Sequence, residues 1–224
     1  MTTPQPQGYL TTPAAGATPS AGATPAVGTG APVLVLHAWW GLNDDVRAYC
    51  DRLAAAGFTA FAADIYRGQV TDTIAGAEAL SKALDGEAAM ADVAAAVDFL
   101  YEQAGRPREG VAVVGFSLGA WLALEASIAH PERVRAVVVY YGTGPDDYEG
   151  AKAAYLGHYA ENDPFEERDY VDAVEAALRR ENRPVTFYHY PGTGHWFAEP
   201  GRADAYDPAA AELAWERTVA FLGK

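Results

Sequence analysis

The chain has little cysteine, a shortage of positive charge and no long apolar run, and each shortage excludes a class of protein. Cys50 is the single cysteine among 224 residues, which excludes an intrachain disulfide and a multi-cysteine metal site. Cys50 lies in a helical pattern, so we interpret it as packing rather than as a nucleophile. Asp and Glu outnumber Lys and Arg by 30 to 16, giving a formal net charge of −14. Such a surface repels phosphate backbones and anionic lipid heads, so we expect neither nucleic acid nor a membrane as a partner.

Targeting and cofactor signals are also missing. No apolar segment reaches the roughly 20 residues that span a bilayer, and the first residues lack the basic and apolar regions of a secretory signal. We therefore expect a cytoplasmic protein. The sequence contains no His-x-x-x-His pattern, and no dinucleotide fingerprint opens a helix after a strand. We expect no metal and no cofactor.

The first 30 residues differ in composition from the rest. Residues 13–30, PAAGATPSAGATPAVGTG, carry no charge and consist mostly of Pro, Ala, Gly and Thr. Low-complexity sequence of this kind cannot bury a core face, so we expect a mobile segment without a chemical role. A short edge strand is predicted before it, at 8–12. The remaining residues, 31–224, are enough for a single domain with one well-buried core.

Strand patterns alternate with helix patterns from Pro32 onward. Strands are predicted at 32–38, 58–65, 111–116, 134–142, 154–160 and 184–190. Helices are predicted at 43–57, twice within 72–104, at 118–129, from Pro164 to about Arg180, and from Pro208 to the end. This order predicts an α/β fold with a mostly parallel twisted sheet and helices on both faces. Ligands bind such sheets beyond the carboxyl ends of the strands, so functional residues should directly follow strands.

Residues 113–121, VVGFSLGAW, place a serine between a strand pattern and a helix pattern. The stretch 115–119 matches G-x-S-x-G, in which a sharp turn lifts the serine hydroxyl above the sheet and small flanking residues avoid clashes. The helix that follows points its N–H groups at a developing oxyanion. A plain helix N-cap is the alternative, but a cap needs neither glycine. We predict Ser117 as a nucleophile.

A serine nucleophile needs a histidine base, and five histidines are available. His130 ends a helix, and His158 and His189 lie inside strands, where we expect core or surface-lining roles. His37 precedes the nucleophile at a strand end and is expected to shape the floor of the site. His195 follows the last strand in the glycine-rich PGTGHWF loop, where a base can hang over the serine. We predict His195 as the base.

The acid should lie between the serine and the histidine in the chain, after a strand. Asp163, in AENDPFEE, follows the strand predicted at 154–160 and is the preferred candidate. Glu161 and the pair Asp146 and Asp147 are the alternatives. Asp163 followed by Pro164 also has the pattern of a helix cap, which is partly compatible with a role as the acid. The two oxyanion N–H groups are expected from Leu118, directly after the nucleophile, and from Trp39, in the turn after the first strand.

These motifs together resemble the dienelactone hydrolase family of α/β-hydrolases. The resemblance covers nearly the whole chain and is carried by VLVLHAWWGLND, ADIYRGQ, GFSLGA, YAENDPF and the segment from GTGHWF to AFL. It implies a lidless, single-domain α/β-hydrolase with nucleophile Ser117, acid Asp163 and base His195.

Three departures from the family prototype bear on the substrate. The prototype has a cysteine where this chain has Ser117, and members often carry a glutamate at the position of Ala38. The prototype also binds a substrate carboxylate with arginines, one of them where this chain has Glu199. An acid at the pocket rim would repel a carboxylate, so dienelactone itself is not the expected substrate. Trp40, Trp121, Trp196 and Glu199 are the candidate substrate-binding residues, and aromatic side chains there would favour neutral, apolar or aromatic groups.

The sequence therefore predicts a serine hydrolase that cleaves a small ester or lactone through an acyl-serine, as a monomer or weak homodimer. A thioesterase or small acyltransferase with the same triad is an open alternative, because all three reactions pass through the same intermediate. A non-catalytic binding protein with this fold is the alternative from another class, since fold alone does not give function.

Overall fold

The computed structural model describes residues 6–14 and 30–224 and contains one seven-stranded sheet covered by helices. The strands are β1 (Gly8–Thr11), β2 (Pro32–Leu36), β3 (Thr59–Ala63), β4 (Val111–Phe116), β5 (Val134–Tyr140), β6 (Ala154–Asn162) and β7 (Val185–Gly194). The helices are α1 (Asp44–Ala55), α2 (Ile74–Ala83), α3 (Gly86–Gln103), α4 (Leu118–Ala129), α5 (Arg168–Arg180) and α6 (Pro208–Leu222).

The spatial order of the strands is β1-β3-β2-β4-β5-β6-β7. The pairs from β3 to β7 are parallel, and β1 is antiparallel to β3. The predicted mostly parallel sheet is confirmed, and β1 lies at one edge of it, over Gly8–Thr11. Most of the low-complexity stretch at 13–30 lies outside the described residues.

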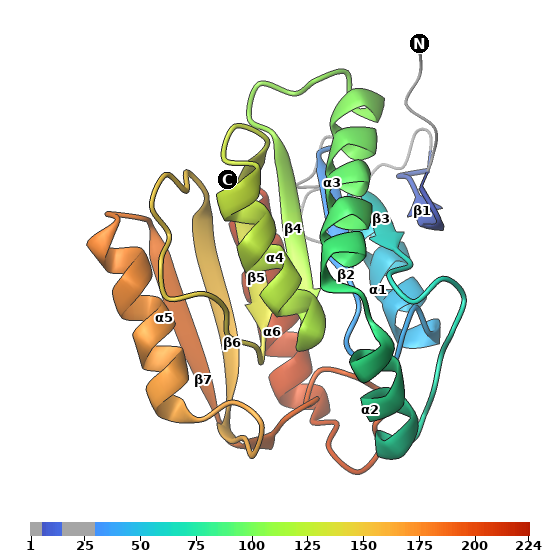
Figure 1. Cartoon of the computed structure of the whole chain (residues 1–224), viewed down its shortest axis with the longest axis vertical. Coiled ribbons are helices and arrows are strands. Elements are labelled where there is room, and N and C mark those ends of the chain that lie inside the picture. The colour runs from blue at the N-terminus through green and yellow to red at the C-terminus, as the bar shows by residue number, and fades with distance from the viewer. Residues whose placement is uncertain (1–5, 15–29) are drawn as a thin grey trace, which may run out of the picture.

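Helices cover both faces of the sheet (Figure 1). Leu34 and Leu36 of β2 face a core that α3, α4 and α5 complete, whereas Val33 and Val35 face a core that α1 and α6 complete. This alternation follows from the two-residue period of a strand, and burial on both faces explains why β2 is apolar throughout. Every residue of β2 is buried. The two cores fix the sheet, so the loops at its carboxyl edge start from rigid positions.

The helix ends follow local chemistry. Asn43, Asp85 and Asp207 accept backbone N–H groups at the starts of α1, α3 and α6, and Pro208 occupies the first turn of α6, where no N–H is needed. The prediction that a helix opens at Pro164 is wrong, because α5 begins at Arg168. No helix in residues 6–14 and 30–224 is both long enough and apolar enough to cross a membrane.

Candidate active site

Ser117 lies on the sharp turn between β4 and α4. Its backbone has φ 49°, in the left-handed region that disfavours side chains. A Cβ on Gly115 would collide with the carbonyl of Gly119, and a Cβ on Gly119 would collide with the carbonyl of Leu36. Both glycines are therefore required by close backbone approach. The Ser117 side chain makes no capping hydrogen bond to α4, which removes the helix-cap interpretation.

The pairing of β6 with β7 brings the acid and the base together. Asn162 pairs with Gly194 in parallel register, so the residues that follow, Asp163 and His195, leave the sheet side by side. The ladder is irregular between Ala160 and Asn162, where three residues of β7 lie opposite the single residue Glu161. The carboxylate of Glu161 accepts the N–H of Gly192. The predicted glycine-rich loop is thus partly an extension of β7, and this extension sets the height of His195 above the sheet.

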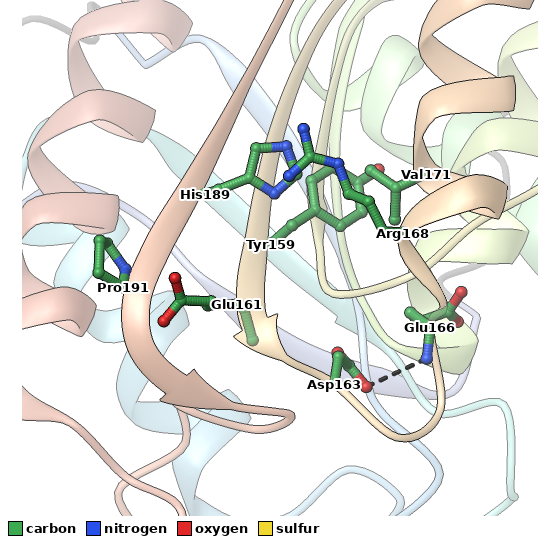
Figure 2. A pocket seen from close by; sticks show the side chains of 9 residues that line it. Tyr159, Glu161, Asp163, Glu166, Arg168, Val171, His189 and Pro191 are labelled. Atoms are coloured by element: carbon green, nitrogen blue, oxygen red, sulfur yellow. Dashed lines mark hydrogen bonds between the residues drawn. The ribbon is translucent and has the colours of Figure 1, made fainter.

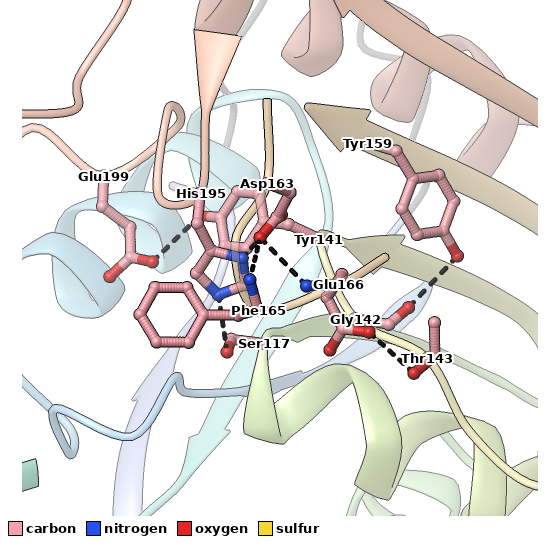
Figure 3. A network of polar contacts seen from close by, with 10 residues as sticks. All are labelled: Ser117, Tyr141, Gly142, Thr143, Tyr159, Asp163, Phe165, Glu166, His195 and Glu199. Atoms are coloured by element: carbon pink, nitrogen blue, oxygen red, sulfur yellow. Dashed lines mark hydrogen bonds and ion pairs between the residues drawn. The ribbon is translucent and has the colours of Figure 1, made fainter. Parts of the chain in front are cut away.

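Ser117, His195 and Asp163 form one continuous hydrogen-bonded chain (Figure 3). Nε2 of His195 lies 3.0 Å from Oγ of Ser117, and Nδ1 lies 2.7 Å from Oδ2 of Asp163. The side chains of His195 and Asp163 are 3% and 4% exposed, so water hardly competes for this contact. In this arrangement the acid fixes the tautomer of the imidazole and leaves Nε2 to accept the serine proton. The catalytic roles of the three residues stay predictions.

The other oxygen of Asp163 anchors the loop that carries it. Oδ1 accepts the backbone N–H groups of Phe165 and Glu166 at 2.9 and 3.1 Å. This local turn takes the place of the helix cap predicted from Asp163 and Pro164, and it delays the start of α5 to Arg168. The same side chain therefore orders its loop through one oxygen and orients His195 through the other. Of the alternative acids, Glu161 binds Gly192 as described above.

The predicted oxyanion donors lie at the ends of neighbouring strands. Leu118 is the first residue of α4, and Trp39 is in the turn after β2, the strand that pairs with β4. The backbone N–H of Ser117 donates to the carbonyl of Tyr140, which holds the turn against β5. Gly142 fits under the turn, since a Cβ there would lie 2.8 Å from the carbonyl oxygen of Ser117. Packing therefore holds the backbone that carries Leu118, and the donor roles of Leu118 and Trp39 stay predictions.

Tyr141 contacts the base from another side, and sequence reasoning assigned it no role in holding the base. It is fully buried, its backbone has φ 38°, and its ring centroid is 5.0 Å from that of His195. Its hydroxyl donates to Oε1 of Glu199 at 3.0 Å. From the sequence, a tyrosine at the end of a strand is expected to be an ordinary core residue. In the structure, the positive φ of Tyr141 beside the site distinguishes it from such a residue.

Glu199 is not the negatively charged rim residue that the sequence predicted. It is only 5% exposed, and it lines a small cavity together with Ala38, Asp45 and Tyr49. Burial, with the nearby charge of Asp45, raises the pKa of Glu199 to about 8, although the Tyr141 hydrogen bond and Arg202 oppose the rise. Position 199 therefore holds a mostly protonated carboxyl at neutral pH. The expected repulsion of anionic substrates does not follow from it there.

Aromatic side chains enclose the site. Trp39 and Trp196 stack with ring centroids 5.9 Å apart, and Trp40 meets Trp196 edge to face at 5.1 Å. The guanidinium carbon of Arg202 lies 4.4 Å from the ring centroid of Trp40 and 5.1 Å from that of Trp196, so cation–π contacts stabilise this pair of rings. Trp40 and Trp196 are buried, which limits their contact with a substrate. Trp121, on the first turn of α4, is 37% exposed.

His37 and His158 lie in structural positions. His37 donates from Nδ1 to the carbonyl of Ala38 and accepts the N–H of Ile65 at Nε2, so it ties the end of β2 to the turn after β3. His158 is fully buried against Tyr190 and Thr218, and burial lowers its pKa to about 3. It is a neutral part of the core at physiological pH.

Behind the acid lies a cavity of about 170 Å³ between β6, β7 and α5 (Figure 2). Asp163 and Glu166 line it on one side, and Arg168 and His189 line it on the other. Glu166 accepts the Thr143 hydroxyl at 2.7 Å, and burial raises its pKa. Sequence reasoning missed Glu166 because a run of acids before a helix normally indicates a solvated helix start. Among the described residues, no group of three or more His, Cys, Asp or Glu side chains is placed to hold a metal ion.

Comparison with known proteins identifies the family. The model of the dienelactone hydrolase family matches residues 19–224. The chain belongs to the dienelactone hydrolase family. This membership implies hydrolase activity on esters or lactones, and the α/β-hydrolase fold described above agrees with it.

Two relatives within the family share much of the sequence. A putative carboxymethylenebutenolidase of Aquifex aeolicus is 34% identical over 96% of this chain and 92% of its own. A probable 2-oxo-3-(5-oxofuran-2-ylidene)propanoate lactonase of a Bradyrhizobium species is 30% identical, over 85% of this chain and 82% of its own.

Two solved structures superpose well on this chain. The structure of m3DLH has a TM-score of 0.77 at 27% identity, over 87% of this chain and 86% of that chain. The dienelactone hydrolase-like promiscuous phosphotriesterase P91, from metagenomic libraries, has a TM-score of 0.76 at 24% identity, over 86% and 85%. The latter similarity supports the fold alone.

Proposed function

We propose that this member of the dienelactone hydrolase family is a serine hydrolase that cleaves small esters or lactones through an acyl-serine intermediate. The observation that carries the proposal is the unbroken chain from Asp163 through His195 to Ser117 on a strained strand-to-helix turn. A binding protein would have no need for a serine in this backbone conformation aligned with a buried acid–base pair.

The first half of the reaction acylates the serine. Nε2 of His195 takes the proton of the Ser117 hydroxyl while Oγ attacks the substrate carbonyl carbon. The negative charge that develops on the carbonyl oxygen is held by the N–H groups of Leu118 and Trp39. When the tetrahedral intermediate collapses, the imidazolium returns the proton to the leaving oxygen. The alcohol departs, or stays tethered if the substrate is a lactone.

The second half releases the acid. A water molecule gives a proton to Nε2 of His195 and attacks the acyl carbonyl, and the collapse of that intermediate returns the proton to Oγ of Ser117. Asp163 stabilises the imidazolium in both halves without itself becoming protonated. Thioester hydrolysis and acyl transfer to an alcohol would pass through the same acyl-serine. The preferred acyl donor and acceptor are therefore identified by comparing rates over a panel of substrates.

The test combines labelling with kinetics. A fluorophosphonate probe should label the wild-type protein once, at Ser117, and kcat for a nitrophenyl ester should fall by roughly 10⁴- to 10⁶-fold in Ser117→Ala. The matched control is Ser81→Ala, which removes a hydroxyl from α2 and should keep both labelling and turnover. Activity of Ser117→Ala near the wild-type level would refute the mechanism. A wild type that neither labels nor hydrolyses esters, lactones or thioesters would favour a binding role.

A further inference from the structure

Phe165 stands out among the residues around the triad because it is a large apolar side chain left 47% exposed. It belongs to the short loop between β6 and α5 that also carries Asp163. Its ring centroid lies 5.0 Å from those of both His195 and Trp196, and 5.7 Å from that of Trp39. Figure 3 shows its ring beside the imidazole. An exposed phenylalanine with three such neighbours is a part of the site surface.

The position of this ring relates it to one part of the substrate. The leaving oxygen must come within hydrogen-bond reach of Nε2 of His195 to receive its proton. Groups attached to that oxygen therefore lie within a few ångströms of the side chains that pack beside the imidazole. Phe165 and Trp196 have these positions, and Trp39 closes the third side while its backbone N–H is the expected oxyanion donor. The leaving group thus meets the rings of Phe165 and Trp39, with the buried ring of Trp196 packed behind them.

The lining also selects by chemistry. Phe165 meets Trp39 edge to face, with an interplanar angle of 74°, while Trp39 and Trp196 are nearly parallel at 28°. These rings present both faces and edges, and another aromatic ring contacts such surfaces more favourably than a saturated ring of the same size does. Arg202 lies against Trp40 and Trp196 and bonds the carbonyl of Asp72, so its charge is already engaged.

The Phe165 side chain can move without disturbing the acid. Its backbone N–H donates to Oδ1 of Asp163, while Oδ2 of the same carboxylate holds His195. Rotation about the side-chain bonds of Phe165 leaves both contacts intact. Its neighbours Trp196 and His195, at 6% and 4% exposure, have no comparable freedom. A ring that adapts on top of a rigid acid–base pair is suited to close over a flat group.

We infer that Phe165 and Trp39, backed by the buried ring of Trp196, form a leaving-group subsite that favours esters of aromatic alcohols. The inference rests on the proposed acyl-serine chemistry and names the substrate class for it. Phe165 is a specificity-determining residue in this account, since it contacts the alcohol part and takes no proton.

The test uses substrates matched in size and in leaving-group acidity. Benzyl acetate and cyclohexylmethyl acetate differ only in whether the six-membered ring is aromatic. We expect wild type to favour benzyl acetate by roughly threefold to tenfold in kcat/KM, the range of one aromatic contact. Phe165→Leu should bring the ratio close to one, and Phe165→Tyr, which keeps the ring, should retain it. Tyr170→Leu, at an exposed aromatic on α5, is the matched control and should also retain it.

A second substrate pair places the ring on the acyl side. The ratio of methyl phenylacetate to methyl cyclohexylacetate should be the same in wild type and Phe165→Leu. Fluorophosphonate titration of Ser117 counts competent sites in each variant, so a folding defect cannot be mistaken for lost selectivity. A benzyl preference that survives in Phe165→Leu, or its absence in wild type, overturns the inference while leaving acyl-serine chemistry standing. Failure of wild type to label or to hydrolyse any ester overturns the proposed function, and this inference with it.

Discussion

Two buried carboxyl groups lie near His195, Asp163 in direct contact with it and Glu199 linked to it through Tyr141, and their hydrogen-bond partners differ. Asp163 and Glu199 are both nearly inaccessible to solvent. Asp163 accepts two backbone N–H groups and the imidazole N–H, whereas among the residues that the structure describes the Glu199 carboxyl accepts only the hydroxyl of Tyr141. Hydrogen-bond donors replace the water that an anion loses on burial, and one hydroxyl does not suffice. Burial is therefore the main reason that the pKa of Glu199 is raised, and its hydrogen bond from Tyr141 offsets only part of that rise, whereas Asp163 is held by three hydrogen bonds.

The largest expected effect comes from breaking the Asp163 side of this pair. Asp163→Asn keeps the size of the side chain but removes its charge and its ability to fix the tautomer of His195, so kcat should fall by roughly 10³- to 10⁴-fold. Glu199→Gln is the matched substitution on the other side and should change kcat at pH 7 by less than about threefold, since it replaces one neutral group with another. Steady-state kinetics on one neutral ester measures both.

Equal losses of kcat in Asp163→Asn and Glu199→Gln would contradict the different roles given to these two carboxyl groups. Circular dichroism and fluorophosphonate titration of both variants separate lost chemistry from lost structure. If Asp163→Asn retained most of the activity, Glu161 would have to be reconsidered as the acid, since it is the nearest alternative along the chain.

The nucleophile turn and the succession of strands and helices along the chain follow from the sequence because they depend on local patterns. Gly115 and Gly119 flank Ser117 at a spacing that only a tight turn needs, and a buried strand and a helix surround them. Asp163 and His195 could be selected by their position after strands. Their contact was not evident, because it depends on the register of Asn162 with Gly194 after an irregular ladder.

Properties that depend on tertiary contacts could not be predicted from the sequence. Four-residue spacing from His195 placed Glu199 near the site, but its burial under Tyr141 results from the turn after β7. The start of α5 was misplaced because the Asp163 side chain bonds its own loop instead of capping a helix. Phe165 has an ordinary loop sequence context, and only its contacts with His195 and Trp39 give it significance.

A smaller effect concerns stability as a function of pH. The folded pKa of Glu199 is raised from an ordinary value of 4.5 to about 8. Between these values the folded protein binds a proton that the unfolded chain releases, so this stabilisation is complete below about pH 4.5 and is lost as the pH rises toward 8. Glu199→Gln removes the dependence. Relative to wild type, the variant should gain on the order of a few kcal/mol in free energy of unfolding between pH 5 and pH 8.

Urea unfolding of both proteins at the two pH values measures this gain. Glu149→Gln, an exposed glutamate, is the control and should show the same pH dependence as wild type. A Glu199→Gln variant whose stability parallels wild type from pH 5 to 8 would mean that Glu199 is already ionised in the folded state.

The smallest expected effect is on charge selectivity. The net charge of −14 and the lack of arginine between Pro184 and Gly201 favour neutral esters at any pH. Glu199 adds a further negative charge beside Tyr141 and His195 only when it ionises, near pH 8. Two like charges roughly 10 Å apart at an effective dielectric of about 20 to 40 repel by about 1 to 2 kcal/mol before screening.

The ratio of kcat/KM for benzyl acetate to that for 4-carboxybenzyl acetate should therefore widen by roughly threefold to tenfold from pH 7 to pH 9 in wild type. It should stay level in Glu199→Gln, because both substrates keep a constant charge over this range and both depend equally on His195. Added salt should narrow the wild-type change. A ratio that is constant with pH in wild type, or that widens equally in the variant, would show that the charge of Glu199 does not act on the substrate.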